Sequence, residues 1–169
     1  MERKWKKIGI AAFGKAVFIS DPGYSPDTWH TGETDKMIPG EYVCYAQFSD
    51  EKERGVRVSA IKAVRKGYES RRAASAEYMD NIGVDTGQCG FYDRDYFLNV
   101  NRDRWGFDVW KEWYSRVRST AYHKDGGFDA GIIDNRCFVS ASGSGNGLYS
   151  CRLKKDEDGN VFELCLKYD

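Results

Sequence analysis

Tyr42-Val43-Cys44-Tyr45-Ala46-Gln47-Phe48 and Val56-Arg57-Val58-Ser59-Ala60-Ile61 decide the fold class. Both runs are rich in β-branched and aromatic residues, which favour strands. The charged segment from Ser49 to Gly55 separates them, so the two runs predict an antiparallel hairpin. Apolar residues alternate with Arg57 and Ser59 in the second run, which predicts one dry and one solvated face.

Further strands are expected on both sides of this hairpin. Residues 8–13 and 16–20 predict a pair of strands joined by a tight turn at Gly14-Lys15. Short strands are expected at residues 81–84 and 90–93, and Tyr68 to Asp80 indicates a short helix or an exposed loop. The last third predicts strands at 130–133, 137–141, 148–153 and 161–166, the final two joined through a charged hairpin loop at 154–160.

One amphipathic helix is predicted after these central strands. Phe107, Trp110, Trp113 or Tyr114, and Val117 recur at intervals of three and four residues. The chain therefore reads as one domain, 1–169, of the α+β class. Its fold is predominantly antiparallel β, a meander or sandwich-like sheet, with one main amphipathic helix packed on it.

Composition limits the classes of partner. Lys plus Arg and Asp plus Glu number 26 each, so there is no whole-molecule positive field and nucleic acid is not favoured, although a local basic patch remains open. The apolar run after the basic start is broken by Gly9, Gly14 and Lys15, so neither a signal segment nor a membrane partner is expected.

The cysteines and histidines indicate a cytoplasmic protein with no metal centre. The chain has five cysteines, none in a C-x-x-C pair, and free thiols in a reducing cytoplasm are the simplest account. His30 and His123 are the two histidines, and neither stands in a zinc-binding pattern. No cofactor is expected.

Asp85-Thr86-Gly87 is the triplet with which aspartic proteases place a catalytic carboxylate. Such a site needs two carboxylates that share a proton, so this chain would have to act as a homodimer. The alternative is a turn in which Asp85 binds its own backbone and Gly87 supplies a positive φ. Cys89, His123 and Asn135 follow the order of a thiol-protease site, but their separations are too short.

The glycine-rich segment from Ser142 to Gly147 precedes a strand. A phosphate-binding loop normally opens a helix, so this segment is a flexible hairpin connection or a loop that contacts a ligand.

Three segments together resemble the bacterial and phage proteins grouped as domain-of-unknown-function family 4241. They are Ile19-Ser20-Asp21-Pro22-Gly23-Tyr24, then Val84-Asp85-Thr86-Gly87-Gln88 with Phe91 and Asp93, and Gly145-Asn146-Gly147-Leu148-Tyr149. Asn146 stands where the family pattern has Asp, and the long Trp-rich helix departs from the family. The resemblance implies a small β-rich domain with no known reaction, in a bacterial, phage or mobile-element setting.

The segments at Asp21, Asp85 and Gly145 are expected to form loops that line one pocket. The chain is then a non-enzymatic binding protein for a small, nucleotide-like ligand or a partner protein. The alternatives are an aspartic-type hydrolase acting as a homodimer through Asp85 and a structural phage protein. No catalytic residue is assigned, and a homo-oligomer is compatible with the sequence. The expected stacking faces are Tyr24, Trp29, Phe91 and Tyr92, and the expected polar contacts are Asp21, Asp85, Thr86, Gln88, Asp93 and Asn146.

Overall fold

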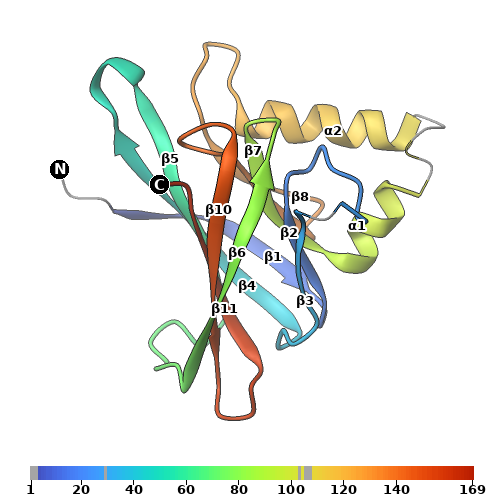
Figure 1. Ribbon diagram of the computed structural model, residues 1–169, viewed down its shortest axis with the longest axis vertical. Helices are drawn as coiled ribbons and strands as arrows, with labels where there is room; N and C mark the ends of the chain where they lie inside the picture. The colour runs from blue at the N-terminus through green and yellow to red at the C-terminus, as the bar shows by residue number, and fades with distance from the viewer. Residues whose placement is uncertain (1–3, 29, 103, 105–107) are drawn as a thin grey trace.

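A computed structural model describes residues 4–28, 30–102, 104 and 108–169, which form two sheets and two α-helices (Figure 1). Every pair of neighbouring strands within the two sheets is antiparallel. The six-stranded sheet has the order β1 (Trp5–Phe13), β4 (Gly40–Asp50), β5 (Val56–Arg65), β11 (Val161–Lys167), β10 (Gly147–Lys155) and β6 (Ser75–Val84). The five-stranded sheet has the order β3 (Gly32–Thr34), β2 (Val17–Ser20), β7 (Gln88–Asp93), β9 (Cys137–Ala141) and β8 (Ala130–Ile133).

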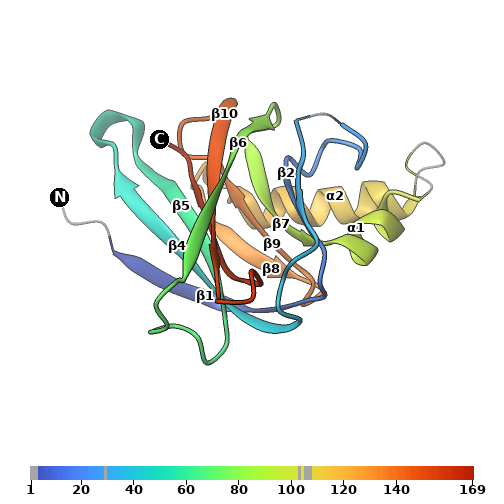
Figure 2. The same ribbon diagram turned by 60° about the horizontal axis from the view of Figure 1, so that its bottom comes forward.

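The helices form a third layer against the five-stranded sheet. Helix α1 spans Arg94–Val100 and helix α2 spans Asp108–Ala121, and a short 3-10 helix, η1, occupies Lys52–Arg54 between β4 and β5. Figure 2 shows α1 and α2 side by side, beyond β7 and β9 from the six-stranded sheet. In the described part of the chain, no helix is long and apolar enough to cross a membrane.

Two apolar cores hold the three layers together. The larger core lies between the sheets and includes Tyr42, Phe91 and Leu164. The second core lies between the five-stranded sheet and the helices and includes Phe18, Tyr92 and Trp113. Strand β7 is buried along its whole length because its successive side chains enter the two cores in alternation.

The structure confirms the α+β, predominantly antiparallel prediction in its sandwich-like form. The β4–β5 and β10–β11 hairpins are present, each with one register shift. The predicted hairpin around Gly14-Lys15 is wrong, because β1 pairs with β4 in one sheet and β2 pairs with β3 and β7 in the other. At this crossing the Gly14 N–H donates to Oδ1 of Asp93 at 2.7 Å.

Two further elements differ from the sequence prediction. From Ser75 onward the segment expected to be a helix or a loop is the edge strand β6, whose residues 75–78 are all exposed. Helix α1 was not predicted; Asp93 caps it by accepting a hydrogen bond from the Tyr96 N–H.

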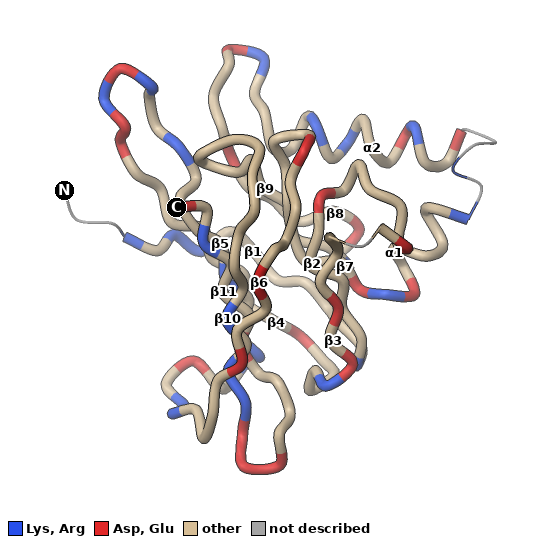
Figure 3. The backbone as a smooth tube through the Cα atoms, viewed as in Figure 1, with Lys and Arg blue, Asp and Glu red and all other residues tan. Residues whose placement is uncertain are grey.

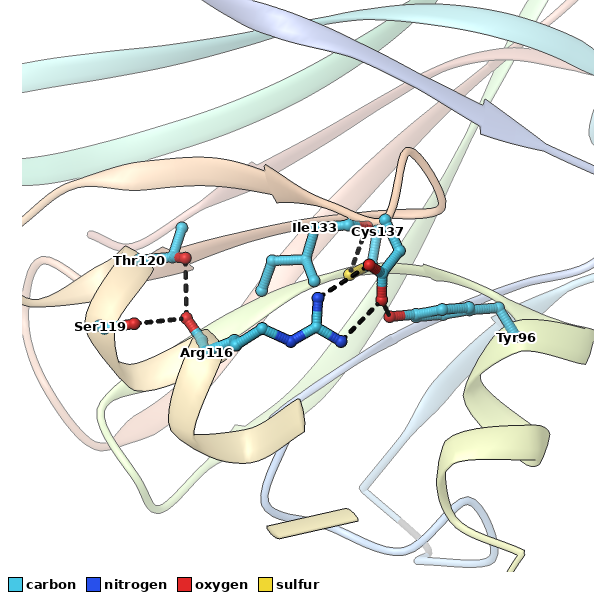
Figure 4. A network of polar contacts seen from close by, with 7 residues as sticks. Tyr96, Arg116, Ser119, Thr120, Ile133 and Cys137 are labelled. Atoms are coloured by element: carbon cyan, nitrogen blue, oxygen red, sulfur yellow. Dashed lines mark hydrogen bonds and ion pairs between the residues drawn. The ribbon is translucent and has the colours of Figure 1, made fainter. Parts of the chain in front are cut away.

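The predicted apolar face of helix α2 is confirmed in part. Trp113, Val117 and Ala121 are buried, whereas Trp110 is only partly buried; Phe107 lies outside the described residues. On the sheet side of the helix, Arg116 binds both carboxylate oxygens of Asp134 at 2.8 and 2.9 Å, and Tyr96 donates to the same carboxylate (Figure 4). The pair links α2 to the turn between β8 and β9, while burial of Trp113 and Val117 holds the helix on the sheet.

Candidate functional site

Asp21 is a fully buried carboxylate at the end of β2. Its Oδ1 accepts hydrogen bonds from the Gly23 N–H and the Thr86 hydroxyl, each at 2.7 Å. Its Oδ2 accepts from the N–H groups of Asp85 and Thr86, also at 2.7 Å. A buried charge is tolerated when hydrogen bonds of this kind surround it. Asp21 therefore holds the turn that joins β6 to β7.

This turn, Asp85-Thr86-Gly87, is called the Asp85 turn below. Asp85 itself is exposed, and its Oδ2 accepts a hydrogen bond from the Tyr24 hydroxyl at 2.7 Å. Among the described residues, no donor contacts the other carboxylate oxygen, Oδ1. Partial burial and the bond to Asp85 raise the pKa of Tyr24, so the phenol remains a donor. The turn thus presents a fixed carboxylate oxygen to solvent.

Gly87 supplies the backbone conformation that the turn requires. Its φ is +72°, and a Cβ built on it would come within 2.5 Å of the Tyr122 hydroxyl. The Gly87 carbonyl accepts hydrogen bonds from that hydroxyl at 2.6 Å and from the Ser142 N–H at 2.8 Å. The expected positive φ is confirmed, but the residue that caps the turn is Asp21 and not Asp85.

Tyr114 of helix α2 and Tyr122, the residue after the end of the helix, contact this region. Besides Tyr122, the hydroxyl of Tyr114 lies 3.3 Å from Nε2 of Gln88, which also reaches the Thr86 hydroxyl at 3.2 Å. Gln88 is fully buried, and it points toward the helix because it shares a face of β7 with Tyr92. Hydrogen bonds therefore hold the Asp85 turn to the end of β2 on one side, and to α2 and Tyr122 on the other.

The glycine-rich loop reaches the same place. Strand β10 pairs with β6 so that Gly147 lies opposite Val84. Asn146 is exposed, and its Oδ1 is 4.0 Å from the position of a Cβ built on Gly87. The loops at Asp21, Asp85 and Asn146 therefore meet at one end of the molecule, with Asp21 buried beneath the exposed turn.

Other predicted site residues lie elsewhere. Phe91 and Tyr92 are fully buried in the two cores, so neither offers a stacking face to a ligand. Asp93 is at the opposite end of β7, about 17 Å from Gln88 at ~3.3 Å per residue. There it is 2% exposed and pairs with Arg136. Trp29 lies outside the described residues.

A groove runs along α2 beside the Asp85 turn. It has a volume of about 450 Å³, within the range of small-molecule sites. Trp110, Tyr114 and Arg118 follow at four-residue intervals along one side of the helix, and Tyr122 comes directly after its end. These four residues, with Lys111, Ser115, Ser119, His123 and Lys124, define the α2 groove.

The aromatic rings of this groove are already ordered. Trp110 and Tyr114 stack with ring centroids 4.8 Å apart and planes at 9°. The Arg104 guanidinium lies over the Trp110 ring at 4.5 Å and donates to the Gly23 carbonyl, which connects the stack to the loop after Asp21. The groove residues of α2 were not predicted as site residues, because Trp110 was assigned to the buried apolar face of the helix. The four-residue spacing from Trp110 to Tyr122 was the pattern that could have identified them.

Cys89 and Asp21 are both buried and engaged within the protein. Cys89 is completely buried, and burial raises its pKa well above the ordinary thiol value, so no thiolate nucleophile forms. Asp21 uses both oxygens to hold backbone and hydroxyl donors, so within one chain it is not a proton-sharing partner for Asp85. No cluster of three or more potential metal ligands occurs in the described ranges. What remains is an ordered surface of hydrogen-bonding groups, rings and cations.

No protein-family model, curated protein or solved structure matches this chain.

Proposed function

We propose that this chain is a non-enzymatic binding protein whose site is the Asp85 turn together with the α2 groove, and that its ligand is a small, planar, anionic molecule of the nucleotide type. The observation that carries the proposal is the use of a buried carboxylate, Asp21, to hold an exposed turn. Burying a charge is costly and does not by itself stabilise the fold. Rigid support of exposed loops is a general feature of binding sites.

The groups at this face suit such a ligand in a definite orientation. The exposed carboxylate of Asp85 accepts hydrogen bonds, which suits the amino and imino groups of a base or the hydroxyls of a ribose. Lys111, Arg118 and Lys124 line the groove next to it and suit a phosphate. The rings of Tyr114 and Tyr122 line the same groove and offer apolar contact to a base.

The test compares Asp85→Ala with a matched control, Asp35→Ala, an exposed aspartate in the loop between β3 and β4. Thermal unfolding of each protein is measured with adenosine, guanosine, cytidine and uridine monophosphates at millimolar concentration. A ligand at about 100 times its Kd stabilises the folded state by ~2.7 kcal/mol, which raises the Tm by several degrees.

The proposal expects such a rise for at least one nucleotide in the wild type and in Asp35→Ala, and its loss in Asp85→Ala with the unliganded Tm unchanged. Equal responses of the two variants would contradict the proposal. A Tm of unliganded Asp85→Ala that falls by ten degrees or so would instead make Asp85 a structural residue.

A further inference from the structure

A chain of hydrogen bonds runs from the buried carboxylate of Asp21 to the α2 groove. The Thr86 hydroxyl lies 2.7 Å from Oδ1 of Asp21 and donates its proton to that carboxylate. Nε2 of Gln88 lies 3.2 Å from the same hydroxyl oxygen and 3.3 Å from the hydroxyl oxygen of Tyr114. Because Tyr114 lines the groove, the buried charge is connected to a side chain that a ligand can touch.

The charge at one end sets the direction of each bond in this chain. An ionised carboxylate can only accept, so the Thr86 hydroxyl donates to Asp21 and offers its lone pairs to its other neighbour. The group of Gln88 that faces these lone pairs is therefore the amide NH₂ and not the carbonyl oxygen. The same NH₂ has a second hydrogen, and this one points to the oxygen of Tyr114.

Tyr114 therefore keeps its own hydroxyl hydrogen for a group in the groove. Its oxygen accepts from Gln88, and within the part of the chain that the structure describes the hydroxyl has no acceptor for its hydrogen. The ring is stacked on Trp110 with centroids 4.8 Å apart, and this contact limits rotation of the side chain. The groove thus presents a hydrogen-bond donor in a defined place.

The Asp85 turn and its neighbour Tyr122 supply acceptors. A carboxylate has about four lone-pair sites, and the Tyr24 hydroxyl occupies one of those of Asp85. The Tyr122 hydroxyl donates to the Gly87 carbonyl at 2.6 Å, so its oxygen is left as an acceptor. Burial raises the pKa of Tyr122, which keeps the hydroxyl protonated and its bond to Gly87 in this direction.

Net charge does not distinguish one nucleotide from another at this face. Figure 3 shows the turn between β6 and β7 and helix α2, and the helix carries side chains of both signs. They include Asp108 and Glu112 as well as Lys111 and Arg118. All nucleoside monophosphates also carry the same phosphate. Selectivity among them has to come from the pattern of donors and acceptors around the base.

We infer that the base bound at this face is guanine, and that Tyr114 is the residue that selects it. The pairing edge of guanine has one acceptor, O6, followed by two donors, N1–H and N2–H₂. O6 accepts from the Tyr114 hydroxyl, and the two donors bind the carboxylate of Asp85. Adenine has a single donor group at this edge, and cytosine and uracil each have two acceptors. The inference rests on the proposed function and names the base.

The experiment measures the Kd of guanosine, inosine and adenosine monophosphates for the wild-type protein by isothermal titration calorimetry. Inosine monophosphate keeps O6 and N1–H but lacks the 2-amino group. A hydrogen bond to a charged group changes affinity by about 10- to 150-fold, so guanosine monophosphate should bind at least about 10-fold more tightly than inosine monophosphate. Adenosine monophosphate should bind more weakly than both, because its amino group would meet the hydroxyl hydrogen of Tyr114.

Tyr114→Phe removes the donor but keeps the ring and its stacking on Trp110. It should weaken guanosine monophosphate by about 2- to 10-fold, the range for a hydrogen bond between neutral groups, and leave the Kd of adenosine monophosphate unchanged. The matched control is Tyr45→Phe, which removes the hydroxyl of another partly buried tyrosine, in strand β4. The control should behave as wild type with all three nucleotides.

Gln88→Met is a second test, because Gln88 is a positioning residue for the Tyr114 hydroxyl. Without the amide N–H, the hydroxyl can turn and accept as well as donate. The ratio of the affinities for guanosine and adenosine monophosphates should then fall toward the ratio in Tyr114→Phe. If Gln88 served the fold alone, Gln88→Met would weaken both nucleotides equally and leave their ratio unchanged.

Two results would overturn the inference: equal affinities of the wild type for guanosine and adenosine monophosphates, or a ratio that neither Tyr114→Phe nor Gln88→Met changes. If either result accompanies binding that Asp85→Ala removes, the choice of base fails while the proposed function stands. If no mononucleotide binds at millimolar concentration, both fail.

Discussion

Replacing Asp21 by Asn tests how the Asp85 turn is supported. Each oxygen of Asp21 accepts two hydrogen bonds, and an amide nitrogen cannot accept. With the Asn nitrogen toward Asp85 and Thr86, two backbone N–H groups lose their acceptor; with it toward Gly23, the Thr86 hydroxyl can accept from the amide but the Gly23 N–H is left without an acceptor. In either orientation the remaining bonds no longer have a charged acceptor. A hydrogen bond to a charged group contributes about 1.5–3 kcal/mol. The variant should therefore lose about 3–6 kcal/mol of unfolding free energy, a large part of a typical total of about 5–15.

The assay is urea unfolding followed by tryptophan fluorescence, with Asp85→Asn as the control. Asp85 is exposed and accepts a hydrogen bond from the Tyr24 hydroxyl. Asp85→Asn should therefore lower the unfolding free energy by less than about 1 kcal/mol. With an m value of about 2 kcal/mol/M, the urea midpoint of Asp21→Asn should fall by roughly 1.5–3 M. A loss below 1 kcal/mol, or equal losses in the two variants, would refute the assignment of Asp21 as the support of the turn.

Three further predictions concern the fold. Gly90→Ala should destabilise the protein by several kcal/mol in urea unfolding, because its Cβ would lie 2.2 Å from the Phe138 carbonyl oxygen; a change below 1 kcal/mol would contradict the β7–β9 packing. Burial raises the pKa of the thiols in the folded protein, Cys89 among them. As the pH rises above about 8.5, the thiols ionise in the unfolded chain but not in the folded protein, so the free energy of unfolding should fall. Each fully buried thiol should cost ~1.4 kcal/mol at pH 9.5, and a urea midpoint equal at pH 7 and 9.5 would count against this. Arg116→Met should lower stability by about 1 kcal/mol or less, since the pair with Asp134 is partly exposed, and Asp134→Asn in the same background should then add little; full additivity would show that the pair is not coupled.

The sequence predicted the elements whose signal is local. The runs around Tyr42, Val56, Leu148 and Val161 carry period-two patterns and charged turns, and each is a strand in the predicted hairpin. The crossing at Gly14 was not predictable, because the contact that determines it is the long-range bond to Asp93. The end of β6 was predicted as the strand at 81–84, but its first part, residues 75–80, was missed because these residues are largely solvated.

The candidate site was predicted in part for a similar reason. The loops at Asp21, Asp85 and Asn146 were singled out by the three segments of the family resemblance, and they do converge. Which carboxylate would be buried depends on how β2 and β7 pair, and no local pattern specifies that pairing. The placement of Phe91 and Tyr92 follows from helices covering the second face of β7, which turns a half-exposed strand into a fully buried one.

The most direct test of the binding face is a titration of ¹⁵N-labelled protein with adenosine and guanosine monophosphates, followed by backbone amide shifts. The account predicts that perturbed amides cluster at Tyr24, the Asp85 turn and residues 110–124 of helix α2 and the segment that follows it. The Asp35→Ala protein should give the same map and Asp85→Ala a weakened one. Perturbations centred instead on the six-stranded sheet around Lys62 and Arg152, or no perturbation by either nucleotide, would contradict the central claim.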